Sequence, residues 1–236
     1  MIDIRRANER FHTDFGWLDS WHSFSFGEHF DRDNQGHGLL IVNNDDTVAA
    51  GGGFGTHGHG DMEIVTWVLS GALRHLDTSG GDGVITPKMA QRMSAGSGVR
   101  HSEMNASDTE PVHFIQMWVL PDESGRGVPP SYEERDLTRS FDGTGGLVPV
   151  ASGRDHDGAV HLHQREAVLW VADLAVGQSV AVPDAPHVHV FVASGAADLS
   201  GGGPLAAGDA ARLTGAGPLA LQATADGTEV LIWETA

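Results

Sequence analysis

Apolar residues along the chain come in short runs that are separated by clusters of glycine and polar residues. Short apolar runs at this spacing, each bounded by turn-forming residues, are typical of the strands of a sandwich or barrel. The clearest runs are Gly38–Val42, Glu63–Leu69, Val112–Leu120, Val168–Leu174, Val188–Val192 and Val230–Trp233. Glycine accounts for 32 of the 236 residues, and so many flexible positions favour frequent turns over long helices. We therefore predict an all-β fold with little helix.

One stretch, Pro130–Thr138, has the pattern of a helix. Ser131 can act as its N-cap. Glu133 and Glu134 place negative charge in the first turn, where the helix dipole favours it. We expect a short helix at this point.

The chain divides at Pro121–Val148, a segment rich in glycine, proline and charge that is typical of a linker. The sequences on its two sides resemble each other, which predicts two tandem copies of one β-unit. The matched segments are Val68–Ala72 and Val192–Ala196, Ala95–Gly98 and Thr214–Gly217, and Ala106–Glu110 and Ala225–Glu229. We expect an N-terminal domain of residues 1–130, and a linker with a C-terminal domain in residues 131–236.

Composition excludes several classes of function. The chain has no cysteine, which rules out disulfides, thiolate metal sites and a cysteine nucleophile. The 14 basic and 32 acidic side chains give a formal charge of −18, which argues against direct binding to nucleic acid. No apolar run approaches the roughly 18–20 residues of a membrane span, and the first residues lack the apolar stretch of a secretory signal. We expect a cytoplasmic protein.

Histidine is abundant, with 14 residues. Three H-x-H motifs occur, and they are His57/His59, His161/His163 and His187/His189. Roughly one such motif arises by chance at this composition, so position must decide between them. We expect His187 and His189 to lie on an outgoing strand, with the hydrogen-bonding needs of their rings satisfied. The pair at 161 and 163 is expected to face solvent, with a peripheral metal contact left open.

Two short pairs are candidate metal ligands, His57 with His59 and His101 with Glu103. Residues i and i+2 of a strand point to the same face, so each pair projects two donors in one direction. Two such strands side by side would bring three imidazoles and one carboxylate to one point. That set suits a divalent first-row ion such as Fe(II), Mn, Ni or Cu, and three histidines alone can hold Zn.

The internal repeat gives an independent expectation about these donors. In the alignment of the two copies, none of the four is retained in the second copy. The residues at the corresponding positions are Ala181, Pro183, Ala220 and Gln222. We therefore expect a metal-binding N-terminal copy and a metal-free C-terminal copy.

The same residues resemble a known family. Two segments are similar to the two cupin motifs, namely His57-x-His59-x-x-x-Glu63 with Gly71, and Gly98-x-x-His101-x-x-x-Asn105. Five segments resemble the pirin family, and they are Gly16–Asp19, Phe24–Gly27, His57–Gly60, His101–Met104 and Gln116–Val119. The resemblance is dense in the N-terminal half and weak in the C-terminal half. It implies a bicupin, with two tandem cupin β-barrels and iron in the N-terminal barrel.

The two patterns differ over the carboxylate ligand, which is Glu63 in the general cupin motif and Glu103 in the pirin pattern. Geometry favours Glu103, because it shares a strand face with His101 at i+2, whereas Glu63 lies roughly 13 Å from His59 along an extended strand. Glu63 is then expected to orient a ligand histidine through a hydrogen bond. The polar residues expected around the ligands are Glu63, Asn105 and Gln116.

The resemblance implies a quercetin 2,3-dioxygenase, which opens a flavonol ring with O2 and releases CO. Fe(II) and a carboxylate, Glu103, would then take the proton of the flavonol 3-hydroxyl group, because an ion with one carboxylate has net charge +1 and favours a phenolate. The alternative is an iron-containing, redox-sensing protein that binds a transcription regulator or a metabolic enzyme. A zinc-containing isomerase or storage cupin is a third reading. Two barrels in one chain already bury the edges that single cupins bury by dimerising, so we expect a monomer.

Overall fold

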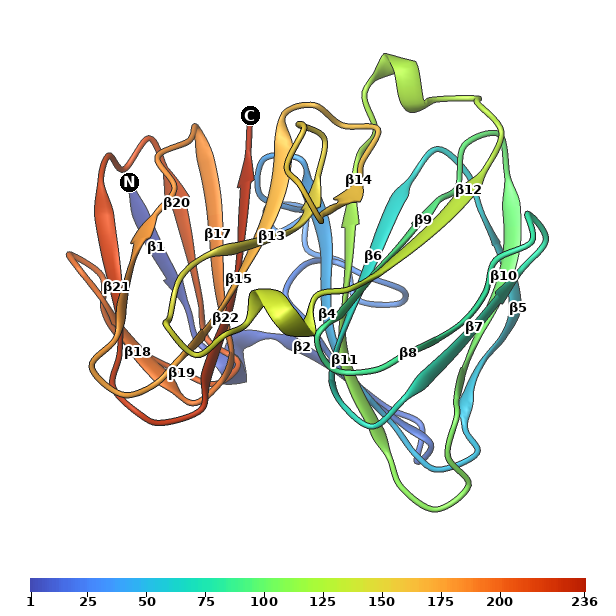
Figure 1. The fold of residues 1–236 in the computed structure, drawn as a ribbon, viewed down its shortest axis with the longest axis horizontal. Coiled ribbons are helices and arrows are strands. Elements are labelled where there is room, and N and C mark those ends of the chain that lie inside the picture. The colour runs from blue at the N-terminus through green and yellow to red at the C-terminus, as the bar shows by residue number, and fades with distance from the viewer.

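The computed structural model describes residues 1–236, which form two β-barrels side by side (Figure 1). Its helical segments are three short 3-10 turns, η1 (Ala7–Glu9), η2 (Glu123–Gly125) and η3 (Thr138–Ser140). The expected all-β fold with two tandem barrels and little helix is confirmed. None of these helical turns has the length or the apolar character that a membrane-spanning helix needs.

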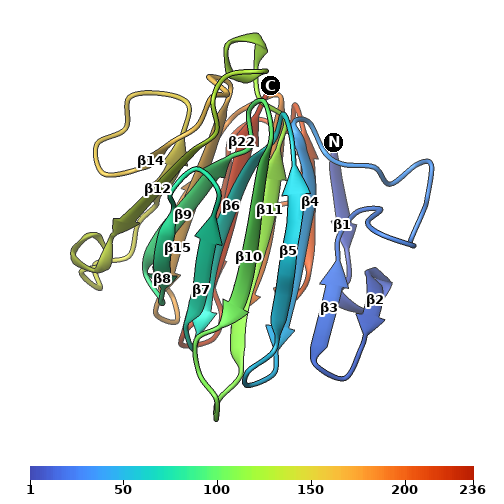
Figure 2. The same cartoon turned by 90° about the vertical axis from the view of Figure 1, so that its right-hand side faces the viewer.

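The N-terminal barrel consists of a seven-stranded and a four-stranded sheet. The larger sheet has the spatial order β12 (Ser131–Asp136), β9 (Met89–Ser94), β6 (Glu63–Ser70), β11 (Val112–Val119), β4 (Leu40–Val48), β3 (Leu18–His22) and β2 (Phe11–Asp14). The smaller sheet has the order β5 (Gly53–His59), β10 (Val99–Asn105), β7 (Leu73–Asp77) and β8 (Asp82–Ile85). Figure 2 shows β5, β10 and β7 running side by side.

The C-terminal barrel repeats this arrangement. Its larger sheet has the order β1 (Ile2–Arg5), β20 (Ala210–Thr214), β17 (His187–Ser194), β22 (Thr228–Thr235), β15 (Ala167–Leu174), β13 (Val148–Ser152) and β14 (Val160–His161). Its smaller sheet has the order β16 (Ser179–Val182), β21 (Leu219–Ala223), β18 (Ala196–Leu199) and β19 (Gly203–Ala206). The two barrels therefore follow the same strand plan.

Each large sheet ends in a strand that comes from the other half of the chain. β1 pairs with β20, so the first strand lies among the C-terminal strands, where Figure 1 draws it in blue beside orange and red. In the same way, β12 pairs with β9 of the N-terminal barrel. The division of the chain into residues 1–130 and 131–236 stays a prediction, and these two strands are hydrogen-bonded across it.

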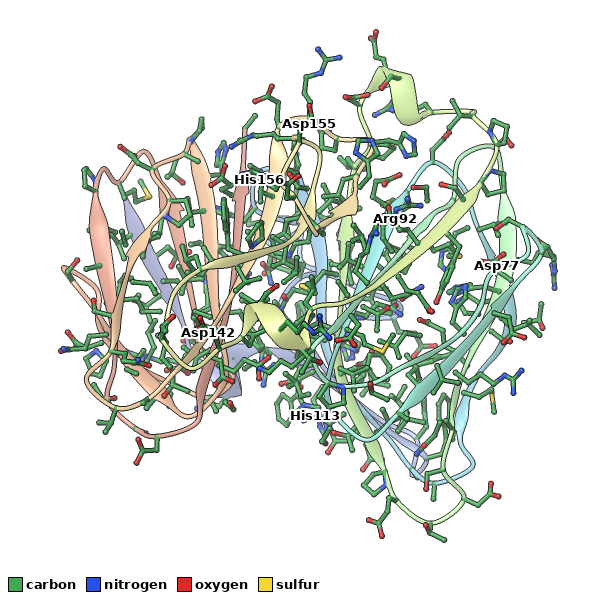
Figure 3. The ribbon with its side chains drawn as sticks, in the orientation of Figure 1. Asp77, Arg92, His113, Asp142, Asp155 and His156 are labelled. Atoms are coloured by element: carbon green, nitrogen blue, oxygen red, sulfur yellow. The ribbon has the colours of Figure 1, made fainter.

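The helix expected at Pro130–Thr138 is wrong, because Ser131–Asp136 forms the strand β12. Six consecutive residues of β12 pair with β9. The guanidinium group of Arg92, which Figure 3 labels, adds hydrogen bonds to the Ser131 carbonyl at 2.9 Å and to Glu133 Oε2 at 3.2 Å. The capping residue and the acidic first turn are local preferences, and this long-range pairing outweighs them.

The largest apolar cluster lies between the two barrels rather than inside either one. It contains 20 buried residues from both halves of the chain, including Trp67 and Trp233. The indole N–H of Trp67 donates to Glu229 Oε1 at 2.5 Å, and that of Trp233 lies 3.1 Å from Met117 Sδ. The two large sheets are therefore joined by a common hydrophobic core.

The interiors of the two barrels differ in polarity. The C-terminal barrel has one cluster of 16 buried apolar residues. The N-terminal barrel has two separate clusters of 7 and 4 residues. It also buries a group of polar side chains, namely Thr66, His75, Gln91, His101, Glu103 and Gln116. Because buried polar groups need partners, this interior is suited to a ligand rather than to apolar packing.

Candidate metal centre

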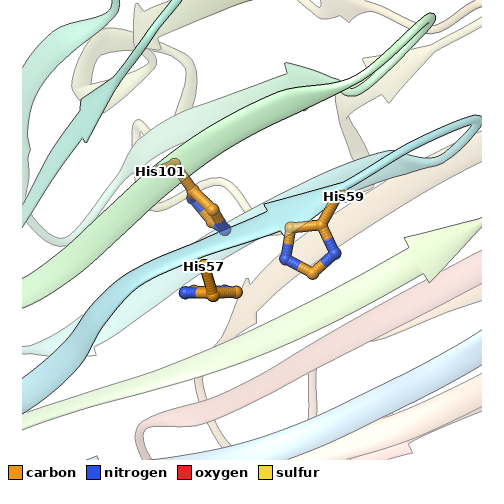
Figure 4. Close-up of side chains that lie close together, drawn as sticks. All are labelled: His57, His59 and His101. Carbon is orange, nitrogen blue, oxygen red and sulfur yellow. The ribbon is translucent and has the colours of Figure 1, made fainter.

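Three histidines from two neighbouring strands meet in the N-terminal barrel, as the sequence predicts. His57 and His59 alternate along β5, and His101 on β10 is paired directly with His57. One ring nitrogen of each lies within 4.8 Å of the others, and the ring centroids are 4.4 to 4.9 Å apart. Figure 4 shows the three imidazoles facing one another. Strand alternation together with strand pairing therefore assembles the triad.

The environment of this triad favours neutral imidazoles. Burial, followed by the nearby His57, lowers the pKa of His101 to about 3 and that of His59 to about 4. His101 is 2% exposed, and neither of its ring nitrogens has a hydrogen-bond partner. A buried nitrogen without a partner is costly, and the neutral form of histidine is the one that binds metal ions. The donor set fits a divalent metal ion.

Glu103 lies two residues beyond His101 on the same face of β10 and is also buried. Its Oε2 accepts a hydrogen bond of 2.7 Å from Gln116 Nε2, while the Thr66 hydroxyl lies 3.5 Å from Oε1. Burial raises the pKa of this carboxyl group. The pairing of β10 with β5 shifts register between His101 and Glu103, and this carboxylate is grouped with His75 and His101 rather than with the donors on β5.

A second group of three donors shares His101 with the first. Its members are His75, His101 and Glu103, whose ligand atoms lie within 4.8 Å of one another and are all buried. We call His57, His59 and His101 the outer group, and His75, His101 and Glu103 the inner group. The four predicted donors are therefore divided between the two groups, and Glu103 belongs only to the inner group.

Sequence reasoning missed His75, which stands outside every H-x-H motif. His75 is on β7 and lies directly opposite Glu103. Its Nε2 is 2.8 Å from Asp77 Oδ2, and its ring stacks on Tyr132 with the centroids 4.7 Å apart. The available signal was the alternation of His75 with Asp77 on a strand next to a ligand strand, which becomes visible only once β7 is paired with β10.

The expected polar partners have different roles. Gln116 donates to Glu103, and its Oε1 accepts a hydrogen bond from Trp118 Nε1 at 3.2 Å. Asn105 does not contact the donors. Its Nδ2 donates to the carbonyls of Val48, Ala49 and Glu110. Asn105 therefore holds the segments that precede β5 and β11.

The expectation that Glu63 orients a ligand histidine is wrong. Its Oε2 accepts hydrogen bonds from Ser94 Oγ at 2.9 Å and from the backbone N–H of His163 at 3.1 Å. Glu63 is on β6, which pairs with β9 and β11 of the larger sheet rather than with β5. The carboxylate therefore holds the His161/His163 segment against the N-terminal barrel.

The third H-x-H motif lies on β17, as predicted for a strand. The expectation of satisfied histidines is wrong for His189, which is fully buried and has no hydrogen-bond partner on either ring nitrogen. The Nδ1 of His187 is also without a partner. Burial lowers the pKa of His189 well below its ordinary value, so this imidazole is neutral.

The sequence repeat matched the donors to residues on the wrong face of the second barrel. Ala181 and Ala220 do pair across β16 and β21, but both are exposed. A one-residue difference in register turns a side chain to the other face of a sheet. The inward-facing neighbours are the buried Val180 and Leu221, which also pair with each other. Apolar residues therefore fill the region of the C-terminal barrel that corresponds to the metal centre.

A cavity of about 700 Å³ leads to the donors. His57, His59 and Glu103 lie in its wall, whereas His75 and His101 do not line it. Aromatic rings form much of the remaining wall, namely Phe15, Trp17, Phe26, Phe54 and Trp118. This volume lies within the range of about 300–1,000 Å³ that is usual for small-molecule sites.

Comparisons with known proteins agree with this geometry. Residues 4–119 match the pirin family profile, and residues 149–235 match the quercetinase C-terminal cupin domain. A Mycobacterium tuberculosis H37Rv protein, provisionally named as a quercetin 2,3-dioxygenase, is 53% identical over 99% of this chain and 94% of its own length. The quercetin 2,3-dioxygenase of Escherichia coli K12 is 46% identical over 76% of this chain and 75% of its own length.

A solved relative shows the same architecture with a metal. The bacterial pirin YhhW of Escherichia coli, in complex with nickel(II), superposes with a TM-score of 0.90 at 37% identity. The match covers 100% of this chain and 99% of YhhW. Together with the two profile matches and the relatives above, it shows that the chain belongs to the pirin family.

Proposed function

We propose that this chain is a metal-dependent quercetin 2,3-dioxygenase, which opens the central ring of a flavonol with O2 and releases CO. The observation that carries the proposal is the convergence of His57, His59 and His101 at one side of an aromatic-lined cavity. The named activity of the Escherichia coli relative supports the same reaction.

We propose that the metal ion is Fe(II), held by His57, His59, His101 and Glu103. Nitrogen donors with one carboxylate suit first-row divalent ions. When bound, such an ion supplies positive charge that favours an ionised substrate oxygen and a redox centre for reaction with O2. Glu103 belongs to the inner donor group in this structure, so its part in the ligand set rests on its position beside His101.

Glu103 is proposed as the base that takes the proton of the flavonol 3-hydroxyl group. It lies in the cavity wall, and burial raises its pKa, which makes it a stronger base than an exposed carboxylate. Gln116 holds Oε2 at 2.7 Å, whereas Oε1 has only the 3.5 Å contact with Thr66. Oε1 is therefore the oxygen that is free to receive the proton.

The cavity walls suit a flat aromatic substrate. The Trp118 ring lies edge-on to His59 at 4.8 Å and to Phe26 at 5.6 Å. Rings in these orientations bind aromatic ligands and keep water out of the site. The cavity also contains His22 and His29, each of which lies 3.0 Å from the Thr13 hydroxyl. These imidazoles can form hydrogen bonds with phenolic hydroxyl groups.

The test is the loss of flavonol absorbance and the release of CO under air, measured with iron-loaded and metal-free protein. We expect both signals only when iron is present, and we expect H57A/H59A to lose them. H156A is the matched control, because His156 lies in the C-terminal half, where its Nδ1 is 2.8 Å from Ser152 Oγ (Figure 3). Iron-loaded protein that releases no CO from quercetin would contradict the proposal.

Other predictions from the sequence concern the setting of this reaction. The cytoplasm as the compartment and the monomer as the solution state stay predictions. The alternative role, an iron-dependent redox sensor that binds a protein, is favoured by a formal charge of −18, which suits a protein partner better than nucleic acid. Iron-dependent capture of a partner without flavonol turnover is the result that would favour this role.

A further inference from the structure

We propose that the N-terminal barrel has a second, inner position for a divalent cation, formed by His75, His101 and Glu103, and that Zn²⁺ is the ion it fits. Two imidazoles and one carboxylate, completed by a water molecule, are a common tetrahedral zinc set. The proposal concerns metal binding and does not depend on the flavonol reaction.

Strand pairing brings these three donors together. β7 and β10 are antiparallel neighbours, and Glu103 lies directly opposite His75. Side chains in directly opposed positions project to the same face, and His101 shares this face because it lies two residues before Glu103. One ligand atom of each residue lies within 4.8 Å of the others, and the three side chains are 0–2% exposed.

The hydrogen bonds of His75 make Nδ1 the nitrogen whose lone pair is available to a metal ion. Its Nε2 is 2.8 Å from Asp77 Oδ2, so this nitrogen carries the proton, and its N–H donates a hydrogen bond to the carboxylate. Its Nδ1 then accepts a long hydrogen bond of 3.4 Å from the side-chain amide of Gln91, and a metal ion at Nδ1 would replace this contact. A histidine that donates one N–H to a carboxylate and offers its other nitrogen is the usual arrangement at metal sites.

Asp77 is itself held in place. Its Oδ1 accepts hydrogen bonds from the Ser79 hydroxyl at 2.6 Å, the Ser79 backbone N–H at 2.7 Å and the Gly81 backbone N–H at 3.1 Å. Figure 3 shows Asp77 at the far side of the N-terminal barrel from the C-terminal one. The carboxylate that orients His75 is thus fixed by the turn that follows β7.

His101 links the two cation positions. Both of its ring nitrogens are buried without partners, and the residue belongs to both donor groups. The outer group has two histidines that line the cavity, whereas in the inner group only Glu103 lines it. An ion at the inner position is therefore held by buried side chains at the edge of the cavity, and it engages Glu103 and His101, which the reaction needs.

The experiment separates the two positions by removing the outer one. H57A/H59A is dialysed against Zn²⁺ alone or Co²⁺ alone, and bound metal is measured by elemental analysis. We expect one ion per chain, with the visible absorption of low-coordinate Co²⁺. Adding H75A should abolish binding, and adding D77N should weaken it about 10- to 100-fold. Adding H156A instead should leave binding unchanged.

Folding of each variant is checked by far-UV circular dichroism, and H75Q replaces H75A if the latter does not fold. Crystals of H57A/H59A soaked in Co²⁺ give a readout that needs no change at position 75. We expect an anomalous peak between His75, His101 and Glu103. Folded H57A/H59A that binds no Co²⁺, binding that persists in H75A, or a peak elsewhere would overturn the proposal. Wild-type protein that binds metal but does not attack quercetin would instead contradict the proposed function.

Discussion

Gln116 donates a hydrogen bond of 2.7 Å from its Nε2 to Oε2 of Glu103, inside the N-terminal barrel. The Oε1 of Gln116 accepts from the indole N–H of Trp118 at 3.2 Å, so the amide cannot turn over without losing both contacts. The orientation of the proposed base is therefore set by a residue that itself belongs to the cavity wall.

The E103Q variant tests the role of the carboxylate. Glutamine has nearly the same shape and keeps a polar group at the position, but it cannot take a proton. We expect folded protein with kcat on quercetin reduced at least about 100-fold, which is the usual contribution of a general base. The rate is measured with iron-loaded protein after its metal content is matched to that of the wild type. Turnover at the parental rate would show that Glu103 is not the base.

The Q116L variant tests the positioning of that base. The hydrogen bond from Gln116 stabilises the ionised form of Glu103 and so opposes the rise in its pKa that burial causes. Without this donor the pKa of Glu103 rises further, and the carboxylate needed for catalysis is lost at a higher pH. We therefore expect the acid limb of the kcat profile to move to higher pH. An unchanged profile with lower kcat at every pH would indicate a packing defect alone.

Asp46 makes stability depend on pH. Burial raises its pKa from 3.8 to about 7. Between these values the folded state keeps a proton that the unfolded chain has lost, so the free energy of unfolding falls as pH rises, in total by about 4 kcal/mol. In D46N this dependence disappears, since the amide is neutral and can still accept from Ser20, the residue that donates to Asp46. Urea unfolding of the wild type and of D46N at about pH 4, 6 and 8 measures the difference in the free energy of unfolding. The same pH dependence in both proteins would contradict this prediction.

Unfolding of the W233A variant and of the wild type tests whether the two barrels unfold together. The Trp233 side chain is 1% exposed and lies in the cluster shared by both large sheets. We expect W233A to lower the free energy of unfolding by about 3–5 kcal/mol, with one transition for both barrels. The transition is followed by far-UV circular dichroism and by the fluorescence of the remaining tryptophans. Two separate transitions in the wild type would show that the common core does not couple the barrels.

The sequence predicts the strands well because their signal is local. The runs Glu63–Leu69 and Val112–Leu120 become β6 and β11 with small shifts at their ends. For the same reason, the alternation within His57–His59 and within His101–Glu103 predicts that the two donors of each pair lie on the same face of their strand. The helix expected at Pro130–Thr138 fails because β12 depends on pairing with β9, which the local sequence does not contain.

The parts of the site that escape prediction depend on which strands become neighbours. His75 becomes a candidate only when β7 is placed next to β10. Glu63 looks like a ligand from its spacing, yet β6 belongs to the other sheet. In the second barrel, the repeat aligns Ala181 with a donor, but the buried side chain is that of its neighbour Val180, because a shift of one residue exchanges the two faces of a strand.

The exchange of β1 and β12 between the barrels determines how the chain can be divided into fragments. A fragment that ends at residue 130 would leave β9 as an open edge, and its own first strand would have no sheet to join. The complementary fragment would expose the edge of β20 in the same way. Unpaired edges of this kind recruit other chains and promote aggregation, so neither half is a self-sufficient module for expression or for transplantation into another protein.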